Sequence, residues 1–223
     1  MVNKTSLTQY QVFLSGPGGV GKSHIIKLVH YETMTRLKQM SGYFEPCDVP
    51  ILLTAFTGTA TFGINGMTLH SALGLSTDLK EYRSLGCDKL NSLRCSLGKL
   101  KLLVIDEISM VGADMLYFIH RHLQEITGNF DSPFGDVSIL AVGDLYQLPP
   151  VEQSFIFKYP SDCYASLYGS LWKKNFKLIE HTEPMRHKED VDFSSTLLRV
   201  RKKEHTENDI MKLKTRLCSD SKE

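Results

Sequence analysis

The segment GPGGVGKS, residues 16–23, has the residue types and spacing that bind phosphate groups. It fits the pattern G-x-x-x-x-G-K-[ST], in which glycines let backbone N–H groups approach an anion. In this pattern Lys22 reaches the β- and γ-phosphates, and the Ser23 hydroxyl binds Mg²⁺. A glycine-rich turn with a chance lysine is the alternative, but an apolar run and a helical pattern flank the segment correctly. The nucleotide-binding residues are therefore predicted to be Gly16, Gly18, Gly19, Val20, Gly21, Lys22, Ser23 and His24.

Two further segments carry polar side chains suited to nucleotide hydrolysis. LLVIDE, residues 102–107, ends in two carboxylates, of which Asp106 is predicted to hold Mg²⁺ and Glu107 to polarise water as a general base. ILAVGDLYQLPPV, residues 139–151, places Gln147 where it would sense the γ-phosphate. Each segment alone is also compatible with an ordinary polar strand end. Their combination with a phosphate loop favours hydrolysis of a nucleoside triphosphate.

The elements that position these residues can be read from apolar patterning. Continuous apolar runs predict buried parallel strands at 12–14, 51–53, 102–105 and 139–142. A helical pattern follows the glycine loop, and another has one apolar face made of Met115, Ile119, Leu123 and Ile126. Strand alternating with helix predicts an α/β sheet, whose strand ends meet at one edge. Residues 76–98 are polar and predict a peripheral insertion with one or two short helices.

Composition limits the remaining possibilities. The 223 residues suit one large domain or two small ones, and the net charge of +1 gives no broad basic surface. Five widely spaced cysteines without a CxxC pair predict free thiols in a reducing compartment. The sequence has no apolar run of membrane-spanning length and no signal-peptide core. We therefore expect an intracellular protein that does not associate with a membrane. His120 and His122 are expected to be surface histidines rather than metal ligands.

The chain resembles the Pif-type (petite integration frequency) DNA helicases of superfamily one. The resemblance runs from about residue 11 to the end, through segments in the family's order: GPGGVGKS, TAFTGTATFGINGMTLHSALGL at 54–75, LLVIDEISM, GDLYQLPPV, and EPMRHKEDVDFSSTLLRVR at 183–201. It implies a three-layer, RecA-like P-loop domain with a mostly parallel central sheet. It also implies an ATP-dependent 5′-to-3′ DNA helicase motor that uses Mg²⁺, with a nuclear or mitochondrial location in a eukaryote.

The same resemblance implies roles for further residues. Arg186 would stabilise charge on the γ-phosphate, and Gly66 would form a tight turn. The expected contacts with single-stranded DNA are Thr57, Gly58, Thr59, Thr68 and His70. Three aromatic residues could stack on bases, although core packing is the stronger expectation for each: Phe62, Tyr146 and Phe155.

The sequence also departs from the family. His187 follows Arg186 where the family often has glutamine, and the glutamine-containing segment that reads adenine is not seen ahead of the first strand. Nothing after residue 201 resembles the second motor domain, which would be a required partner. We therefore expect a single motor domain over residues 1–223, either a fragment or a short gene product, that binds nucleotide but does not unwind DNA alone.

Two other classes of function compete with this reading. A small nucleotide kinase or GTPase is disfavoured because the sequence has no NKxD motif and no arginine-rich lid. A non-catalytic DNA-binding or scaffold module derived from a helicase is the second alternative. It predicts that Lys22→Ala and Glu107→Gln leave function intact, and the presence of all the hydrolytic side chains argues against it.

Overall fold

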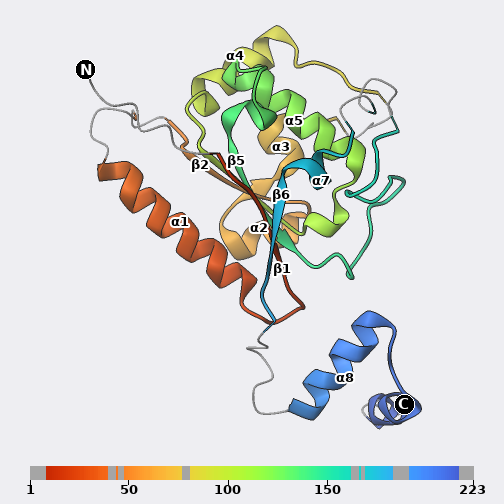
Figure 1. Ribbon diagram of the computed structural model, residues 1–223. Coiled ribbons are helices and arrows are strands. Elements are labelled where there is room, and N and C mark those ends of the chain that lie inside the picture. Colours follow the sequence, from red (N-terminus) through yellow and green to blue (C-terminus); the bar gives the residue numbers. More distant parts are fainter. Residues whose placement is uncertain are drawn as a thin grey trace, which may run out of the picture.

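A six-stranded parallel sheet forms the centre of the computed structural model, which describes residues 9–39, 44, 48–76, 81–161, 166, 169–182 and 191–215. The strand order is β3-β2-β4-β5-β1-β6, and every neighbouring pair is parallel (Figure 1). The strands are β1 Gln11–Ser15, β2 Ile51–Ala55, β3 Met67–Thr68, β4 Leu102–Asp106, β5 Ser138–Gly143 and β6 Phe176–Glu180. The four predicted apolar runs all lie within strands, in β1, β2, β4 and β5.

Helices cover both faces of this sheet, so the predicted three-layer α/β fold is confirmed. One apolar cluster joins the sheet to α1 (Lys22–Gln39) and α2 (Gly58–Ile64), through Ile26 and Ile64. A larger cluster lies on the opposite face, beneath α3 (Leu69–Leu73), α4 (Cys87–Leu97), α5 (Ala113–Thr127) and α7 (Leu171–Asn175). Figure 1 shows α1 on one side of the sheet and α4 and α5 on the other.

The helix α5 is buried more completely than its sequence pattern predicts. Met115, Ile119, Leu123 and Ile126 are buried, as expected for its apolar face. His120 and His122 are also buried, so their predicted surface position is wrong. The His120 Nδ1 atom accepts a hydrogen bond from the Phe134 N–H at 2.9 Å, and the ring nitrogens of His122 lie 3.0 and 3.2 Å from two carbonyl oxygens. Packing by α3, α4 and the turn Pro133–Asp136 leaves α5 no solvent-exposed polar face for them.

The region 76–98, predicted to be a peripheral insertion, contains one described helix, α4. Leu93 and Leu97 of this helix are buried in the larger cluster, and Arg94 donates two hydrogen bonds to the Glu125 carbonyl oxygen of α5. Residues 77–80 lie outside the described residues. In the described part of the chain Cys87 and Cys95 are exposed free thiols, as expected.

The two strands that the sequence did not predict both lie at edges of the sheet. β3 has only two residues, and β6 pairs with β1 in the register Gln11↔Phe176 while leaving Leu178 and Ile179 exposed. Neither strand has the continuous buried run that marks a central parallel strand. The edge strands therefore carry too little apolar signal to be recognised from sequence.

Two C-terminal helices, α8 (Val191–Lys202) and α9 (Glu207–Lys214), lie below the sheet in Figure 1. They are joined to each other by Asp209, which accepts hydrogen bonds from Thr196 and Arg199. Thr206 and Asp209 form a capping box at the start of α9. Within the described ranges no helix is long and apolar enough to cross a membrane.

Candidate active site

The glycine-rich loop connects β1 to α1 and has the backbone shape that binds phosphate. Gly19 and Gly21 have φ angles of 82° and 91°, which residues with a side chain rarely adopt. At Gly16 a Cβ would lie 2.5 Å from the His181 carbonyl oxygen, so this position also requires glycine. Because α1 starts at Lys22, its N-terminal N–H groups point toward the loop and favour an anion there.

The side chains of the loop are arranged around this anion position. The Lys22 ammonium donates to the carbonyl oxygens of Gly16 and Pro17, at 2.8 and 2.9 Å, and so lies over the loop. Val20 is fully buried, which leaves its backbone as the part that can contribute to binding. Ser23 and His24 occupy the first turn of α1, where both are exposed.

Asp106 and Glu107 lie at the carboxyl end of β4. Burial raises the pKa of Asp106 above its ordinary value; the Glu107 charge adds to this effect, whereas the Glu107 N–H and Lys22 oppose it. The Glu107 N–H donates to Asp106 Oδ1 at 2.9 Å, and Glu107 itself has a left-handed backbone, with φ at 55°. The Asp106 carboxylate and the Ser23 hydroxyl offer oxygen ligands, which Mg²⁺ prefers, and Mg²⁺ keeps several waters or phosphate oxygens besides. The described residues contain no cluster of three or more metal-binding side chains.

Gln147 lies beside the glycine loop, and its role as a γ-phosphate sensor stays a prediction. It is exposed in the turn after β5, where its N–H donates to the Asp144 carbonyl oxygen at 2.9 Å. Its amide nitrogen lies 3.9 Å from the position that a Cβ on Gly18 would take. A cleft of about 330 Å³ opens here between Gly18, Gln147 and Leu197 of α8.

Sequence reasoning missed the contact that joins α8 to this cleft. The Arg201 guanidinium donates through Nε and Nη2 to both carboxylate oxygens of Asp144, each at 2.7 Å. Asp144 is only 1% exposed, and the guanidinium also lies 4.5 Å from the Tyr146 ring centroid. Arg201 and Asp144 both fall within motifs recognised in the sequence. They are 57 residues apart, however, and a contact between such distant positions leaves no local sequence signal.

The expected DNA contacts lie together at the carboxyl ends of β2 and β3. Thr57 caps α2 by accepting from the Ala60 N–H at 3.3 Å, and Gly58 and Thr59 are exposed at the start of that helix. Thr68 caps α3 and lies opposite Ala55 in the β2–β3 pairing. The small hydroxyl side chains expected to contact DNA are therefore brought to one edge of the sheet.

His70, the fifth expected DNA contact, is half-buried in α3. Burial lowers the pKa of this imidazole, and its ring packs against the edge of Phe56 with centroids 5.7 Å apart. At neutral pH it is therefore an uncharged side chain, which can offer DNA a hydrogen bond or a stacking surface but no positive charge.

A hydrogen bond joins a residue predicted to serve the nucleotide to a residue predicted to contact DNA. The Thr57 hydroxyl donates to Glu107 Oε2 at 2.7 Å. The two residues follow neighbouring strands, because the β2–β4 register places Ala55 opposite Asp106. The sequence predicted roles for Thr57 and Glu107 separately and gave no sign of this contact.

Gly66 lies in the turn before β3, where its N–H donates to the Thr61 carbonyl oxygen at 3.0 Å. The positive φ of that turn belongs to Asn65, at 53°, and a Cβ on Gly66 would overlap the Leu53 carbonyl oxygen.

One expectation for the aromatic residues needs correction. Their expected core packing is wrong, since Phe62, Tyr146 and Phe155 are 89%, 62% and 39% exposed. Phe62 is almost fully exposed, whereas the Tyr146 ring lies against the Arg201 guanidinium and the Phe155 ring stacks on Phe157.

Arg186 and His187 lie outside the described residues, so the predicted role of Arg186 on the γ-phosphate stays a prediction.

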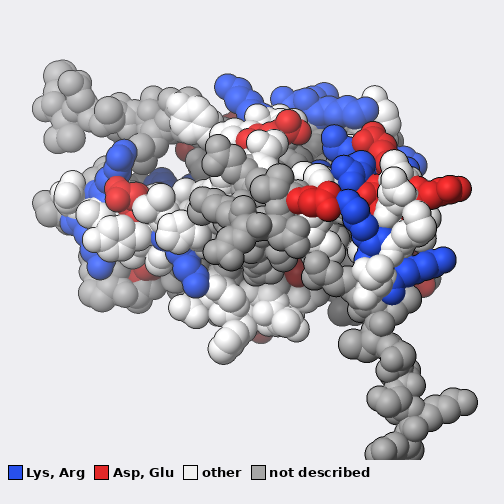
Figure 2. Space-filling view, turned by 90° about the horizontal axis from the view of Figure 1, so that it is seen from below, with Lys and Arg blue, Asp and Glu red and all other residues white. Residues whose placement is uncertain are grey.

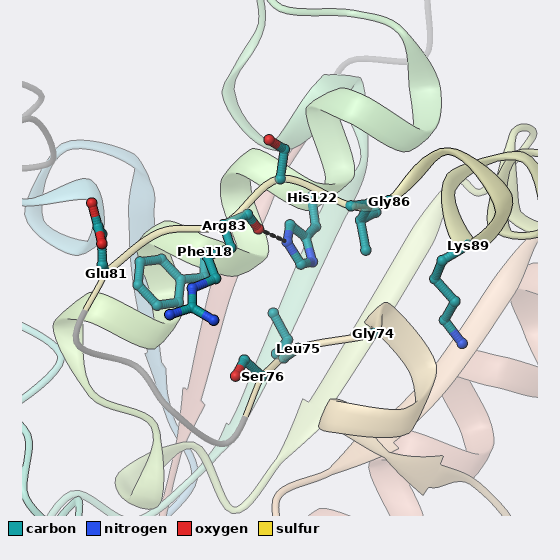
Figure 3. A pocket seen from close by; sticks show the side chains of 11 residues that line it. Gly74, Leu75, Ser76, Glu81, Arg83, Gly86, Lys89, Phe118 and His122 are labelled. Atoms are coloured by element: carbon teal, nitrogen blue, oxygen red, sulfur yellow. Dashed lines mark hydrogen bonds between the residues drawn. The ribbon is translucent and has the colours of Figure 1, made fainter.

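A second cavity, of about 200 Å³, lies away from the phosphate motifs. Figure 3 shows it between the end of α3, the segment 81–86 and α5, with His122 reaching the Arg83 carbonyl oxygen. None of its lining residues belongs to the glycine loop or to the ends of β4 and β5. The cleft at Gly18 and Gln147 is therefore the candidate active site.

Charge on the surface agrees with the near-neutral composition. Figure 2 shows Lys and Arg side chains interspersed with Asp and Glu side chains on the face seen from below. Among the coloured residues of that face both signs of charge are mixed, so a nucleic-acid contact of these residues would depend on individual side chains.

Comparisons with known proteins agree with this geometry. Residues 2–210 match the family model described as PIF1-like helicase. The chain is 34% identical over 147 residues to the ATP-dependent DNA helicase Pif1 of Psychrobacter sp. (strain PRwf-1), a match that covers 65% of this chain and 20% of the relative. It is 30% identical over 202 residues to the ATP-dependent DNA helicase PIF1 of Xenopus laevis, covering 90% and 29% of the two chains.

A solved structure shows the same fold. The chain superimposes with a TM-score of 0.63 and 29% identity on the crystal structure of Pif1 helicase from Bacteroides in complex with ADP-AlF3 and ssDNA. The match covers 96% of this chain and 48% of that one. The chain thus spans under a third of the two curated relatives and about half of the solved structure.

Proposed function

We propose, on the premise that this chain belongs to the PIF1-like helicase family, that it is an ATP-dependent DNA helicase motor domain. It binds ATP with Mg²⁺, hydrolyses the terminal phosphate and contacts single-stranded DNA. The observation that carries the proposal is the convergence on one sheet edge of Lys22 over the glycine loop, Asp106 beside it and Gln147 next to Gly18. Positioned charge of this kind is most of what phosphoryl transfer requires from a protein.

Each residue has a defined part in this reaction. Lys22 exchanges its two backbone carbonyl partners for β- and γ-phosphate oxygens, and the loop N–H groups hold the same phosphates. Ser23 and Asp106 would hold Mg²⁺, which neutralises charge on the phosphates when bound. Glu107 orients the attacking water and Gln147 contacts the γ-phosphate. Arg186 adds positive charge to the γ-phosphate, a role that rests on the family resemblance.

The wider activity of the relatives is proposed for this chain by resemblance only. The 5′-to-3′ direction, and unwinding in replication, repair, recombination or telomere maintenance, are proposed by family resemblance. Unwinding needs a cleft that opens and closes between two bodies, so a second RecA-like domain is the proposed partner of residues 1–223. An intracellular location, nuclear or mitochondrial in a eukaryote, is proposed on the same ground.

Nucleotide binding and turnover, measured with and without single-stranded DNA, test this function. We expect the wild type to bind ATP in the presence of Mg²⁺ and Lys22→Ala to bind it about 10- to 100-fold more weakly. Glu107→Gln should bind ATP but turn it over about 10² to 10⁴ times more slowly, as expected for loss of a general base. Adding the second motor domain should raise turnover and permit unwinding of a forked duplex.

The scaffold alternative predicts the opposite pattern. In that case both variants bind DNA like the wild type, and no property of the chain depends on nucleotide. Strand separation by the 223-residue chain alone would contradict the proposed need for a second domain.

A further inference from the structure

The hydrogen bond between Thr57 and Glu107 joins the two halves of the proposed site. Thr57 follows β2 and Glu107 follows β4, and the pairing of these strands fixes the distance between them. The Glu107 backbone N–H donates to Asp106 Oδ1 at 2.9 Å, which restrains the backbone from which the Glu107 side chain extends. Its Oε2 atom then accepts the Thr57 hydroxyl at 2.7 Å, a bond to a charged acceptor in a partly buried place.

The Thr57 hydroxyl has only one proton to give. It accepts from the Ala60 N–H as the cap of α2 and donates its proton to Glu107. A sugar-phosphate oxygen of DNA is an acceptor and can be bound only by donation. Contact of Thr57 with DNA and contact of Thr57 with Glu107 therefore exclude each other.

The same bond affects what Glu107 can do. A general base must lie within hydrogen-bond reach of the water that it activates. In this structure Glu107 Oε2 accepts the Thr57 hydroxyl. An oxygen that already accepts this hydrogen bond is a weaker acceptor for the water that Glu107 would activate. Releasing the hydroxyl returns this oxygen to the nucleotide side.

We propose that Thr57 is a positioning residue, which restrains Glu107 until the Thr57 hydroxyl donates its hydrogen bond to single-stranded DNA instead. We call this exchange of partners the Thr57 switch. This inference rests on the proposed function, because it requires both ATP and DNA to bind here. It deepens that function by naming how DNA binding controls hydrolysis. Since coupling between two sites is reciprocal, Glu107 must also weaken the binding of DNA.

A double-mutant cycle in DNA affinity tests the inference without requiring turnover. Anisotropy of a labelled oligothymidine, at one fixed salt concentration, gives the affinity of the wild type, Thr57→Val, Glu107→Ala and the double variant. Removing the Glu107 side chain should tighten DNA binding at least about fivefold more in the wild-type background than in the Thr57→Val background. Electrostatic and folding effects of Glu107→Ala occur in both backgrounds and cancel.

Turnover supplies the second readout. Thr57→Val should raise DNA-independent ATP turnover and lose stimulation by DNA, whereas Thr57→Ser, which keeps the hydroxyl, should behave as the wild type. A threonine that serves only as a helix cap would lower stability without changing the ratio of turnover with and without DNA.

The possible failures are distinguishable. Additive effects in the cycle would overturn the switch while leaving the proposed function in place. Failure of the wild type to bind single-stranded DNA would overturn the DNA part of the proposed function and the switch with it. Equal stimulation of Thr57→Val and wild type by DNA would overturn the switch alone.

Discussion

Lys22 illustrates how a single residue connects the fold to its chemistry. Its ammonium satisfies two carbonyl oxygens of its own loop, which keeps the charge at the position where phosphate oxygens would replace them. The sequence pattern predicted this lysine because both the helix start and the glycine turns are local features. The pairing of Thr57 with Glu107 was not predictable, because it depends on which strands are neighbours.

Lys22→Ala should weaken the affinity for ATP by about 10- to 100-fold, the effect of losing a hydrogen bond to a charged group. Titration with a fluorescent ATP analogue measures this change. Lys27→Ala is the matched control, since Lys27 is exposed on the same helix and lies outside the phosphate loop. Equal weakening by both substitutions would show a nonspecific charge effect.

The buried His120 predicts a pH dependence of stability. Burial lowers its pKa to about 4 with a smaller contribution from Arg121, whereas an unfolded histidine titrates near 6.5. Between these values the unfolded state binds the extra proton, so the free energy of unfolding falls as pH falls. We expect a loss of about 2 kcal/mol between pH 7 and pH 5, measured by urea denaturation.

His120→Asn should remove this part of the pH dependence while keeping an acceptor for the Phe134 N–H. His205→Asn, at an exposed position, should leave the pH dependence unchanged. An unaltered profile in His120→Asn would mean that another group is responsible.

At the scale of elements, the apolar pattern of the sequence predicted the central strands. It failed where the burial of a residue depends on elements that are distant in sequence. The runs of β1, β2, β4 and β5 are buried on both faces and are continuous in sequence. The surroundings of α5 are set by elements distant in sequence, so the burial of its histidines could not be read from its own pattern. The packing of Gly66 against β2 was hidden for the same reason.

Gly66→Ala should destabilise the fold by about 2 kcal/mol or more, because the new Cβ overlaps the backbone oxygen of Leu53, which cannot move aside cheaply. Gly63→Ala is the matched control within the same segment. Gly63 lies in α2 with no atom within 4 Å of its virtual Cβ, so alanine should be neutral or stabilise by about 0.5–1 kcal/mol. Urea denaturation of the two variants compares them directly, and equal effects would contradict the close approach at Gly66.

At the scale of the whole molecule, α8 is held to the turn after β5, residues 144–147, by the Arg201–Asp144 ion pair. The turn carries Gln147, and the cleft between it and α8 also contains residues of the glycine loop. The ion pair therefore holds α8 against the segment that carries Gln147. The sequence located both segments by their motifs but could not show that they touch.

Arg201→Ala should cost about 3–5 kcal/mol in stability, because it leaves the buried Asp144 carboxylate without its partner. Lys212→Ala breaks an exposed pair with Asp192 and should cost under about 1 kcal/mol. Thermal or urea unfolding measures both. A small change in the free energy of unfolding for Arg201→Ala would show that the ion pair with Asp144 does not hold α8 to the turn after β5.

The most direct measurement is a crystal structure of this chain with ADP–aluminium fluoride, Mg²⁺ and single-stranded DNA. We expect the phosphates to lie within Gly16–Ser23, with Lys22, Asp106 and Gln147 directed at the fluoride group. We also expect the Thr57 hydroxyl to contact a DNA phosphate and Glu107 to have turned toward the nucleotide. Nucleotide bound at another place, or these side chains directed away from one another around it, would show that residues 16–23 are not the nucleotide site of this chain.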